Sequence, residues 1–333
     1  MQNQAWVIQK PSVGRYRPDV LRLEQRQVPA PAEGELLVRT LYISLDPSNL
    51  VWLKLLPGWM EDVKVGDIMK GPSLGVVEIS RHPAYAPGDI VTGPLQWRPR
   101  SVVQGALVRG IGAAPNAPLA DHLIIYSHVG RAAYIGMMIV GRVRPGDTVV
   151  VSGAAGATGS VAAQLAKHAG ARVVGIAGGA EKCAFLAETL GLDATVDYRN
   201  EELAAGFART CPNGIDMYFD NVGGETLDTA LLHMKVHGRI SICGTISQYS
   251  GNEYSQPYRL GNMFHMLMKR IRMEGFVTPD FIDRYDEMDH ALAKAGIKAR
   301  VHWLDGLDKA AEGLELLVTG GNHGKLLVKL ADS

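Results

Sequence analysis

Apolar and polar residues alternate along the second half of the chain in a regular order. From about residue 130, short apolar runs alternate with segments in which apolar residues recur every three or four positions. The apolar runs predict strands buried on both faces, and the segments between them predict amphipathic helices. This alternation is typical of an α/β fold with a doubly wound parallel sheet of the Rossmann type. The expected strands cover 148–153, 172–178, 194–198, 215–223 and 239–245, and the expected helices cover 131–144, 157–170, 180–191, 200–210 and 225–238.

The first 125 residues have a different pattern, with short β-like runs between turns rich in Pro and Gly. The clearest strands are 35–45, 75–80 and 89–93, and HPAYAPGD over 82–89 is a turn cluster. Such a pattern predicts a small barrel or sandwich. The tail KLLVKL over 325–330 again resembles a strand, as if it rejoined the first domain. We therefore expect one domain over 1–125, completed by about 300–333, and a Rossmann domain over 126–299.

Composition and charge restrict the class of partner. The 333 residues are 47% apolar and 20% charged, as in ordinary globular proteins, and Lys+Arg and Asp+Glu both count 34. This balance gives no reason to expect nucleic acid or a membrane surface as partner. We find no signal peptide and no apolar run of roughly 20 residues that could span a membrane. Three widely spaced cysteines suit a reducing, cytoplasmic location.

The stretch VVVSGAAGATGSV over 149–161 resembles a dinucleotide-binding fingerprint with one glycine missing. Gly156 and Gly159 occupy the second and third glycine positions of G-x-G-x-x-G, and Ala154 occupies the first. Alanine can stand there if the turn needs no positive φ. The motif follows a predicted apolar strand and opens a predicted helix, which is the context that pyrophosphate binding requires. We therefore expect a dinucleotide site rather than a simple tight turn.

The end of the second predicted strand indicates which dinucleotide binds. An NAD site normally has Asp or Glu there to bind the ribose hydroxyls. Here the sequence is Gly-Ile-Ala-Gly-Gly, with Gly178 at the strand end and the first acid, Glu181, already in the next helix. Lys182, with Tyr198 and Arg199 after the third strand, could bind a 2′-phosphate, although each of these cations could also be a solvated surface charge. Together with the missing acid, they favour NADPH.

Metal and nucleophile motifs are not evident. No cysteine pair has zinc spacing, and the histidines form no H-E-x-x-H or H-x₃₋₅-H arrangement that we interpret as a metal site. His233 and His237 are four residues apart, but we expect His237 to cap the carboxyl end of a helix. Metal-free hydride transfer is the chemistry that remains.

Over most of its length the chain resembles the medium-chain dehydrogenase/reductase superfamily. The residues that carry the resemblance are 133–175 around the glycine loop, YFDNVGGETLD over 218–228, GRISICGTISQY over 238–249 and GNHGKLLVKL over 321–330; LYISLDPS and VGDIMKGPSLGVVEIS add to it in the first half. It is closest to the zinc-free branch of leukotriene/prostaglandin reductases and alkenal double-bond reductases.

The resemblance implies an N-terminal GroES-like β-barrel domain, a Rossmann domain, an active site in the cleft between them, and a homodimer joined through the edge strands of the Rossmann sheets. It further implies that Lys182 and Tyr198 contact the 2′-phosphate. The implied pyrophosphate contacts are Ala155, Gly156, Ala157 and Thr158. The other implied cofactor contacts are Asn221, Cys243, Gly244, Thr245, Ile246, Ser247, Tyr249, Phe276, Val277, Thr278 and Asn322.

The family's reaction is 1,4-reduction of an α,β-unsaturated aldehyde or ketone, a small-molecule activated alkene, with NADPH. Charge collects on the carbonyl oxygen as hydride reaches the β-carbon, so a hydrogen-bond donor must already be in place. The resemblance assigns this role to Tyr249, either as proton donor or as stabiliser of the enolate. Tyr254 and Tyr258 in the same stretch compete for the role, and Tyr249 could instead be an aromatic that packs near the cofactor.

The chain departs from its relatives after Asp46-Pro47. Relatives continue with an aromatic residue, as in D-P-Y-M-R, whereas this chain continues Ser48-Asn49-Leu50. We expect a different substrate pocket, with Ser48, Tyr254 and Tyr258 beside it and with Trp52 and Trp59 as a bulky wall or as buried core. Two other functions remain open: NADPH:quinone reduction and a non-catalytic NADPH-binding sensor.

Overall fold

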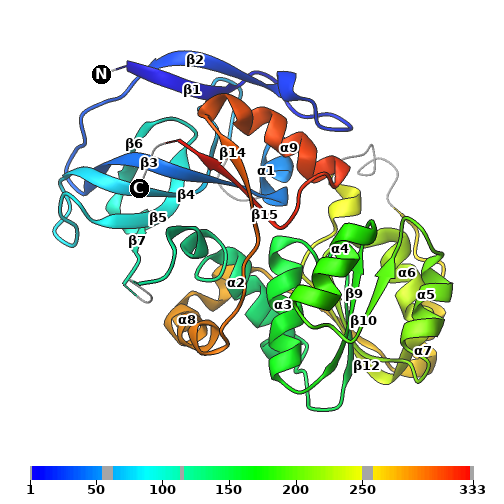
Figure 1. Ribbon diagram of the computed structural model, residues 1–333. Helices are drawn as coiled ribbons and strands as arrows, with labels where there is room; N and C mark the ends of the chain where they lie inside the picture. The colour runs from blue at the N-terminus through cyan, green and yellow to red at the C-terminus, as the bar shows by residue number, and fades with distance from the viewer. Residues whose placement is uncertain (1, 55–62, 113–115, 250–257, 331–333) are drawn as a thin grey trace. The chain divides into compact units, whose positions relative to one another are not determined.

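A computed structural model describes residues 2–54, 63–112, 116–249 and 258–330, which form two compact units. The first unit contains residues up to 123 and those from 301 onward, and the second contains 124–249 and 258–300. Figure 1 shows both units, with labels on many of their helices and strands. Each unit has its own sheet and its own apolar core.

The first unit is built around a largely antiparallel seven-stranded sheet. Its strand order is β14-β15-β3-β4-β5-β7, with β6 paired to β3, and β1 and β2 form a separate antiparallel pair. The strands and helices of this unit are β1 Gln2–Ile8, β2 Leu21–Gln27, β3 Glu35–Leu45, α1 Pro47–Trp52, β4 Lys70–Ser80, β5 Ile90–Gln96, β6 Arg100–Gln104, β7 Arg109–Gly110, β14 Val301–Asp305, α9 Ala310–Thr319 and β15 Lys325–Lys329.

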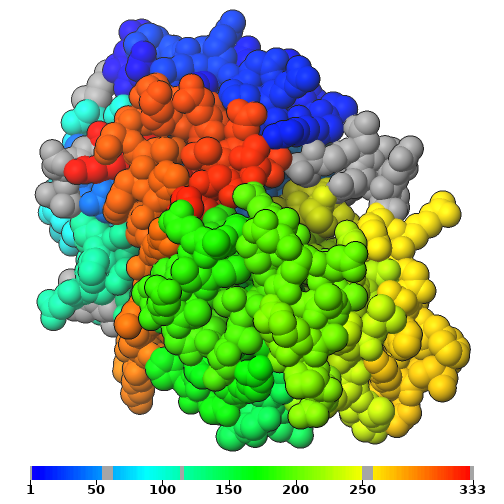
Figure 2. Space-filling view, turned by 45° about the vertical axis from the view of Figure 1, so that its right-hand side comes forward, coloured from blue at the N-terminus to red at the C-terminus, as the bar shows by residue number. Residues whose placement is uncertain are grey.

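The end of the chain is an integral part of this unit. β15 lies between β14 and β3, pairs antiparallel with β3, and is buried along most of its length. α9 packs on the N-terminal segment, where Tyr16 donates a hydrogen bond to Ala311 O at 2.9 Å and Trp6 Nε1 donates to Leu307 O at 2.7 Å. In the space-filling view, the orange atoms of α9 lie against the blue N-terminal strands (Figure 2).

The second unit has a six-stranded, wholly parallel sheet in the order β10-β9-β8-β11-β12-β13. This is the order of a Rossmann fold. α3 and α4 cover one face, and α5, α6 and α7 cover the other (Figure 1). The elements are α2 His128–Tyr134, β8 Thr148–Val151, α3 Ala157–His168, β9 Arg172–Ala177, α4 Ala180–Ala184, β10 Ala194–Asp197, α5 Leu203–Thr210, β11 Ile215–Asp220, α6 Gly224–His233, β12 Met234–Ile242, α7 Phe264–Lys269, β13 Arg272–Gly275 and α8 Tyr285–Lys294.

The predicted α/β class and the parallel Rossmann sheet are confirmed, but one predicted helix is too long. The helix expected over 225–238 ends at His233, and β12 begins at Met234. Met234 takes extended backbone angles and pairs with Ile215, so it packs in the core instead of continuing the helix. His237 therefore lies in a strand, with φ +62°. The prediction that it caps the carboxyl end of a helix is wrong.

The first unit contains a buried ion pair between Lys325 and Asp46. Lys325 at the start of β15 forms an ion pair with Asp46, and both side chains are almost fully buried. Asp46 also accepts a hydrogen bond from Ser44 Oγ at 2.5 Å, and Lys325 Nζ donates to Leu45 O at 3.4 Å. The pair therefore ties the start of β15 to the end of β3, immediately before α1.

This arrangement predicts the outcome of Lys325→Met. Removal of one partner leaves a buried carboxylate without its counter-charge, and we expect a loss of about 3–5 kcal/mol in the free energy of unfolding. The exposed pair Lys10–Asp19 provides a matched control, since Lys10→Met should cost no more than about 1 kcal/mol. Urea unfolding monitored by fluorescence measures both. Equal losses in the two variants would contradict a stabilising role for the buried pair.

Candidate active site

The carboxyl ends of the parallel strands bring most of the predicted cofactor residues to one edge of the sheet in the second unit. In a parallel sheet all carboxyl ends lie at the same edge, and ligands bind where the strand order reverses. That reversal lies between β8 and β11. The residues that follow the strands there are Ala155–Thr158 after β8, Gly178 after β9, Tyr198 after β10, Asn221 after β11, Cys243–Tyr249 after β12 and Phe276–Thr278 after β13.

The glycine loop turns tightly from β8 into α3. Its positive φ, +58°, falls on Gly153, so alanine at 154 is tolerated, and Ala154 is fully buried. Gly156 precedes the first turn of α3, which contains Ala157 and Thr158. A Cβ at Gly159 would lie 2.3 Å from Gly153 O. Glycine there lets α3 begin close against the loop, with its amino end at the sheet edge where it can attract an anion.

Asp220, which the sequence analysis did not single out, organises the neighbouring loops. Its carboxylate is fully buried and accepts hydrogen bonds from Ser152 Oγ at 2.8 Å, from Val222 N at 3.0 Å and from Gly223 N at 3.1 Å. Burial raises the pKa of Asp220, although these hydrogen bonds oppose the shift. The position of Asp220 at the end of an apolar strand, within FDNVGG, was the available signal.

The same cluster fixes Asn221 and the segment after β12. Asn221 donates from its backbone N to Ser152 Oγ at 2.8 Å and from its amide Nδ2 to Ser152 O at 2.7 Å. Asp220 O accepts from Cys243 N at 2.8 Å and from Gly244 N at 3.1 Å. The loops after β8, β11 and β12 are therefore a single hydrogen-bonded unit.

Tyr249 folds back onto the segment that contains it. Ile246–Gln248 form a single 3₁₀ turn, and the Tyr249 hydroxyl accepts a hydrogen bond from Thr245 N at 3.1 Å. A hydroxyl that accepts one hydrogen bond still has its own proton to donate. Burial, reinforced by the charge of Asp220, raises the pKa of the nearby Cys243 thiol to about 12, so this thiol stays protonated at neutral pH.

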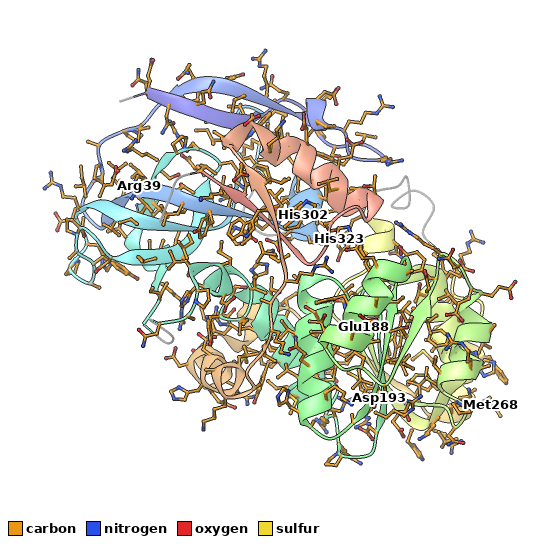
Figure 3. All side chains as sticks on the ribbon, viewed as in Figure 1. Arg39, Glu188, Asp193, Met268, His302 and His323 are labelled. Atoms are coloured by element: carbon orange, nitrogen blue, oxygen red, sulfur yellow. The ribbon has the colours of Figure 1, made fainter. Side chains whose placement is uncertain are left out.

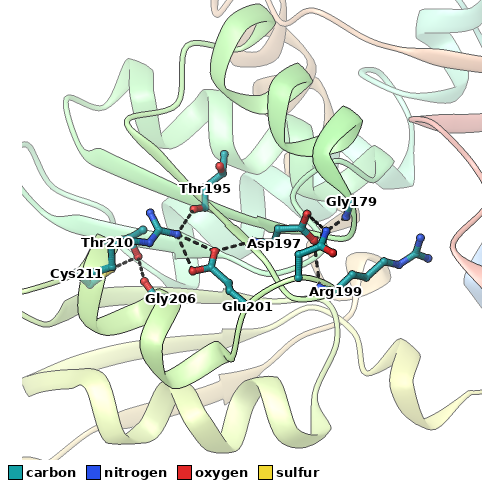
Figure 4. Close-up of polar contacts among 10 residues, drawn as sticks. Gly179, Thr195, Asp197, Arg199, Glu201, Gly206, Thr210 and Cys211 are labelled. Atoms are coloured by element: carbon teal, nitrogen blue, oxygen red, sulfur yellow. Dashed lines mark hydrogen bonds and ion pairs between the residues drawn. The ribbon is translucent and has the colours of Figure 1, made fainter.

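A second polar network shapes the ends of β9 and β10 (Figure 4). Asp197 accepts hydrogen bonds from Gly179 N at 2.7 Å, from Asn200 Nδ2 at 2.7 Å and from Arg199 N at 3.1 Å. Burial opposes ionisation of Asp197, but these hydrogen bonds outweigh it and lower the pKa of the carboxyl. The Asp197 carboxylate therefore fixes the backbone of the loops after β9 and β10. A Cβ on Gly178 would lie 2.7 Å from the Tyr198 hydroxyl. The absence of a side chain at residue 178 therefore leaves room for the Tyr198 ring.

Positive charge gathers beside these loops. Burial lowers the pKa of Lys182, and the positive charges of Arg199 and Arg300 lower it further, while Glu181 opposes the shift. Like charges held near one another in a folded chain favour a bound anion, which relieves their repulsion. β9 itself ends in Ala177 followed by Gly178 and Gly179, with no carboxylate for ribose hydroxyls.

The predicted residues after β13 differ in their packing, and Asn322 lies in the other unit. Phe276 packs with Ile135 and Met288, while Val277 is half exposed at the start of the next 3₁₀ segment. Asn322 belongs to the first unit, where its amide donates to Gly324 O at 2.8 Å. His323 lies beside His302 there, with ring centroids 6.1 Å apart (Figure 3).

The residues expected around the substrate are divided between the units. Ser48 and Trp52 lie on α1 of the first unit, and both are partly buried. Tyr258 lies in the second unit, where its hydroxyl donates to Asp228 Oδ2 at 3.2 Å. Tyr254 and Trp59 fall outside the described residues.

Among the described residues, no group of three or more His, Cys, Asp or Glu side chains is placed to hold a metal ion. In the same part of the chain, no helix is both long and apolar enough to cross a membrane.

Comparison with known proteins gave matches along nearly the whole chain. Residues 4–111 match a family model described as the N-terminal domain of oxidoreductase, and residues 157–294 match one described as zinc-binding dehydrogenase. The NADPH-dependent curcumin reductase of Escherichia coli is 35% identical, over 99% of this chain and 97% of its own. The NADP-dependent 2-alkenal reductase of Nicotiana tabacum is 36% identical, over 90% and 88%. The crystal structure of CurA from Vibrio vulnificus in complex with NADPH aligns with a TM-score of 0.90 at 33% identity, covering 99% of this chain and 100% of that one.

Proposed function

This chain belongs to the zinc-independent branch of the medium-chain dehydrogenase/reductase family, and on that basis we propose that it is an NADPH-dependent ene-reductase. It reduces the C=C bond of α,β-unsaturated aldehydes or ketones by 1,4-addition. The relatives that support this reaction are named for reduction of curcumin and 2-alkenals with NADPH or NADP. The observation in this chain that supports it most is the strand-end arrangement, with a glycine loop at the strand reversal and positive charge where an NAD site has an acid.

The residues present fit NADPH. The loop from Gly153 to Gly159 leads into the amino end of α3, a place for the pyrophosphate. Lys182 and Tyr198 are the proposed contacts of the 2′-phosphate. Lys182 lies in α4, the helix after β9, Tyr198 directly follows β10, and the positive charges of Arg199 and Arg300 lower the pKa of Lys182. Asn221 and the segment Cys243–Tyr249 line the sheet edge beside the strand reversal.

NADPH, when bound, supplies hydride to the β-carbon of the alkene. The π electrons of the C=C bond would then move toward the carbonyl and charge would collect on the carbonyl oxygen. The α-carbon takes up a proton that comes from water, either directly or through Tyr249, which is then reprotonated by water. Tyr249 is the proposed donor at the carbonyl oxygen, because its hydroxyl sits on a stiff ring and its proton is available. The bond from Thr245 N polarises the Tyr249 hydroxyl and makes it a better donor.

We also propose a homodimer, formed through the outer edge of the parallel sheet. Within the described residues β13 pairs on one side only, with β12. Beside it, Phe264, Leu267 and Met268 on α7 are more than half exposed, and Met268 is labelled at the margin of this unit in Figure 3. An unpaired edge flanked by apolar side chains suits a second copy of the same surface. Light scattering tests this: a mass near 35.9 kDa would reject the dimer.

The cytoplasm is the compartment that we propose. All three cysteines, Cys183, Cys211 and Cys243, are free thiols, as a reducing compartment would leave them. Cell fractionation measures this directly, and recovery of the protein in a secreted fraction would contradict it.

The reaction is tested by product analysis. We expect the purified chain to oxidise NADPH with enals or enones and to form the saturated carbonyl compound. Quinones assayed in parallel separate this reaction from the rival one, because they accept hydride without yielding a saturated ketone. Turnover of quinones alone would reject the proposed reaction, and NADPH binding without turnover of any acceptor would favour a sensor.

Lys182→Ala should impair the use of NADPH much more than that of NADH. Loss of one charge-assisted contact to the 2′-phosphate is expected to raise the KM for NADPH by roughly tenfold and to leave the KM for NADH almost unchanged. Steady-state kinetics with both cofactors measure the two values. Lys167→Ala, which removes an ion pair with Asp193 elsewhere on the unit, is the matched control. Equal effects of Lys182→Ala on the two cofactors would remove Lys182 from the phosphate site.

Tyr249→Phe should lower turnover with little effect on cofactor binding. The substitution keeps the ring but removes the hydroxyl donor, and we expect kcat to fall by about 10²-fold. NADPH fluorescence titration should give an unchanged Kd. Tyr258→Phe, which removes a hydroxyl bonded to Asp228, is a comparison for a second tyrosine of the same stretch. If Tyr249→Phe kept full turnover while Tyr258→Phe lost it, the donor would be Tyr258.

A further inference from the structure

Arg300 approaches the proposed 2′-phosphate site from a segment far along the chain. Its guanidinium forms an ion pair with Glu181 at 2.9 Å and lies over the Phe185 ring, 5.0 Å from the centroid. Glu181 is in the first turn of α4 and Phe185 directly follows that helix, so both contacts are made to the helix after β9. Arg300 is thus held beside the loop that discriminates between the cofactors.

The backbone just before Arg300 is anchored to α3. Gln164, buried on α3, donates from Nε2 to Lys298 O at 3.0 Å and accepts from Lys298 N at 2.9 Å. A paired amide clamp of this kind fixes both position and direction of the backbone, because donor and acceptor must both be satisfied. The segment that presents Arg300 is therefore fastened to the helix whose amino end serves the proposed pyrophosphate site.

Both acidic and basic side chains lie around this loop. Its carboxylates include Asp197, Glu181 and Glu201, of which Glu201 accepts a hydrogen bond from Asp197 N at 3.0 Å and forms an ion pair with Arg209. The Asp197 carboxylate accepts backbone hydrogen bonds and is also stabilised by the positive charge of Arg199. Glu181, two-thirds exposed, would otherwise repel a phosphate dianion and could accept from ribose hydroxyls, as an acid does in NAD sites. Arg300 forms an ion pair with this carboxylate at 2.9 Å.

We propose that Arg300 is a specificity-determining residue: it neutralises Glu181 and so makes the pocket accept a 2′-phosphate rather than a free ribose hydroxyl. This inference rests on the proposed use of NADPH. Arg300 acts through Glu181 and is a positioning residue, not a catalytic one. The effect of Arg300 and Arg199 on the pKa of Lys182 agrees with a shared positive potential at this place.

The experiment compares binding of 2′,5′-ADP and 5′-AMP by calorimetry, which needs no alkene and no turnover. In Arg300→Met the apolar stem still covers Phe185 but the charge is gone. We expect the preference for 2′,5′-ADP to fall by roughly tenfold, with 5′-AMP binding unchanged. Arg300→Lys, which keeps the charge, should retain most of the preference. Glu181→Gln combined with Arg300→Met should restore the preference to within about twofold, because the charge to be neutralised is also gone.

Arg284→Met is the matched control, since Arg284 forms a similar exposed ion pair with Glu287 on another surface of the unit. An Arg300→Met variant with the original preference would overturn the proposal, and so would a double variant as impaired as Arg300→Met alone. Equal loss of both nucleotides in Arg300→Met would also overturn it, by showing a structural role. If the unsubstituted protein bound both nucleotides equally, the proposed NADPH function itself would fail.

Discussion

The buried carboxylate of Asp220 is the constraint on which the arrangement of the sheet edge depends. A carboxylate without water must have its oxygens satisfied by donors. Here the donors are Ser152 in the loop after β8, the turn after β11, and the Tyr218 hydroxyl on β11 itself. The backbone oxygen of Asp220 accepts from Cys243 and Gly244 after β12. Three loops far apart in the sequence therefore have one common reference point.

The hydrogen bonds to Asp220 and Asn221 also fix the segment that carries the proposed donor. Tyr249 follows the segment that Asp220 and Asn221 hold, and its hydroxyl is oriented by Thr245 within that segment. The glycine loop leads into α3 on the other side of the same cluster. Preorganisation of this kind matters for hydride transfer, because a donor fixed beforehand stabilises developing charge without the cost of reorientation.

The charged side chains at the strand reversal differ from those beyond β9 and β10. At the strand reversal, the buried carboxylate of Asp220 accepts hydrogen bonds from the neighbouring loops, so it shapes those loops. Beyond β9 and β10, Asp197 accepts hydrogen bonds in a similar way and Glu181 is paired with Arg300. The cations Lys182, Arg199 and Arg300 are then close enough to affect one another. The balance at this end is positive, in keeping with a phosphate that NAD lacks.

The sequence by itself determined the class of fold and most of the strand-end residues, because both follow from local patterns. Apolar runs alternating with helical periods specify a parallel sheet, and the residues after each run lie at one edge whatever the packing details. Tertiary contacts decided what depends on distant partners. Met234 pairs with Ile215 in a strand and does not extend the helix before it. Asp220 binds three loops together, and Asp46 forms an ion pair with Lys325, which lies 279 positions later in the sequence. Arg300 reached Glu181 across 119 positions, a pairing that no local spacing encodes, because burial and charge act through space.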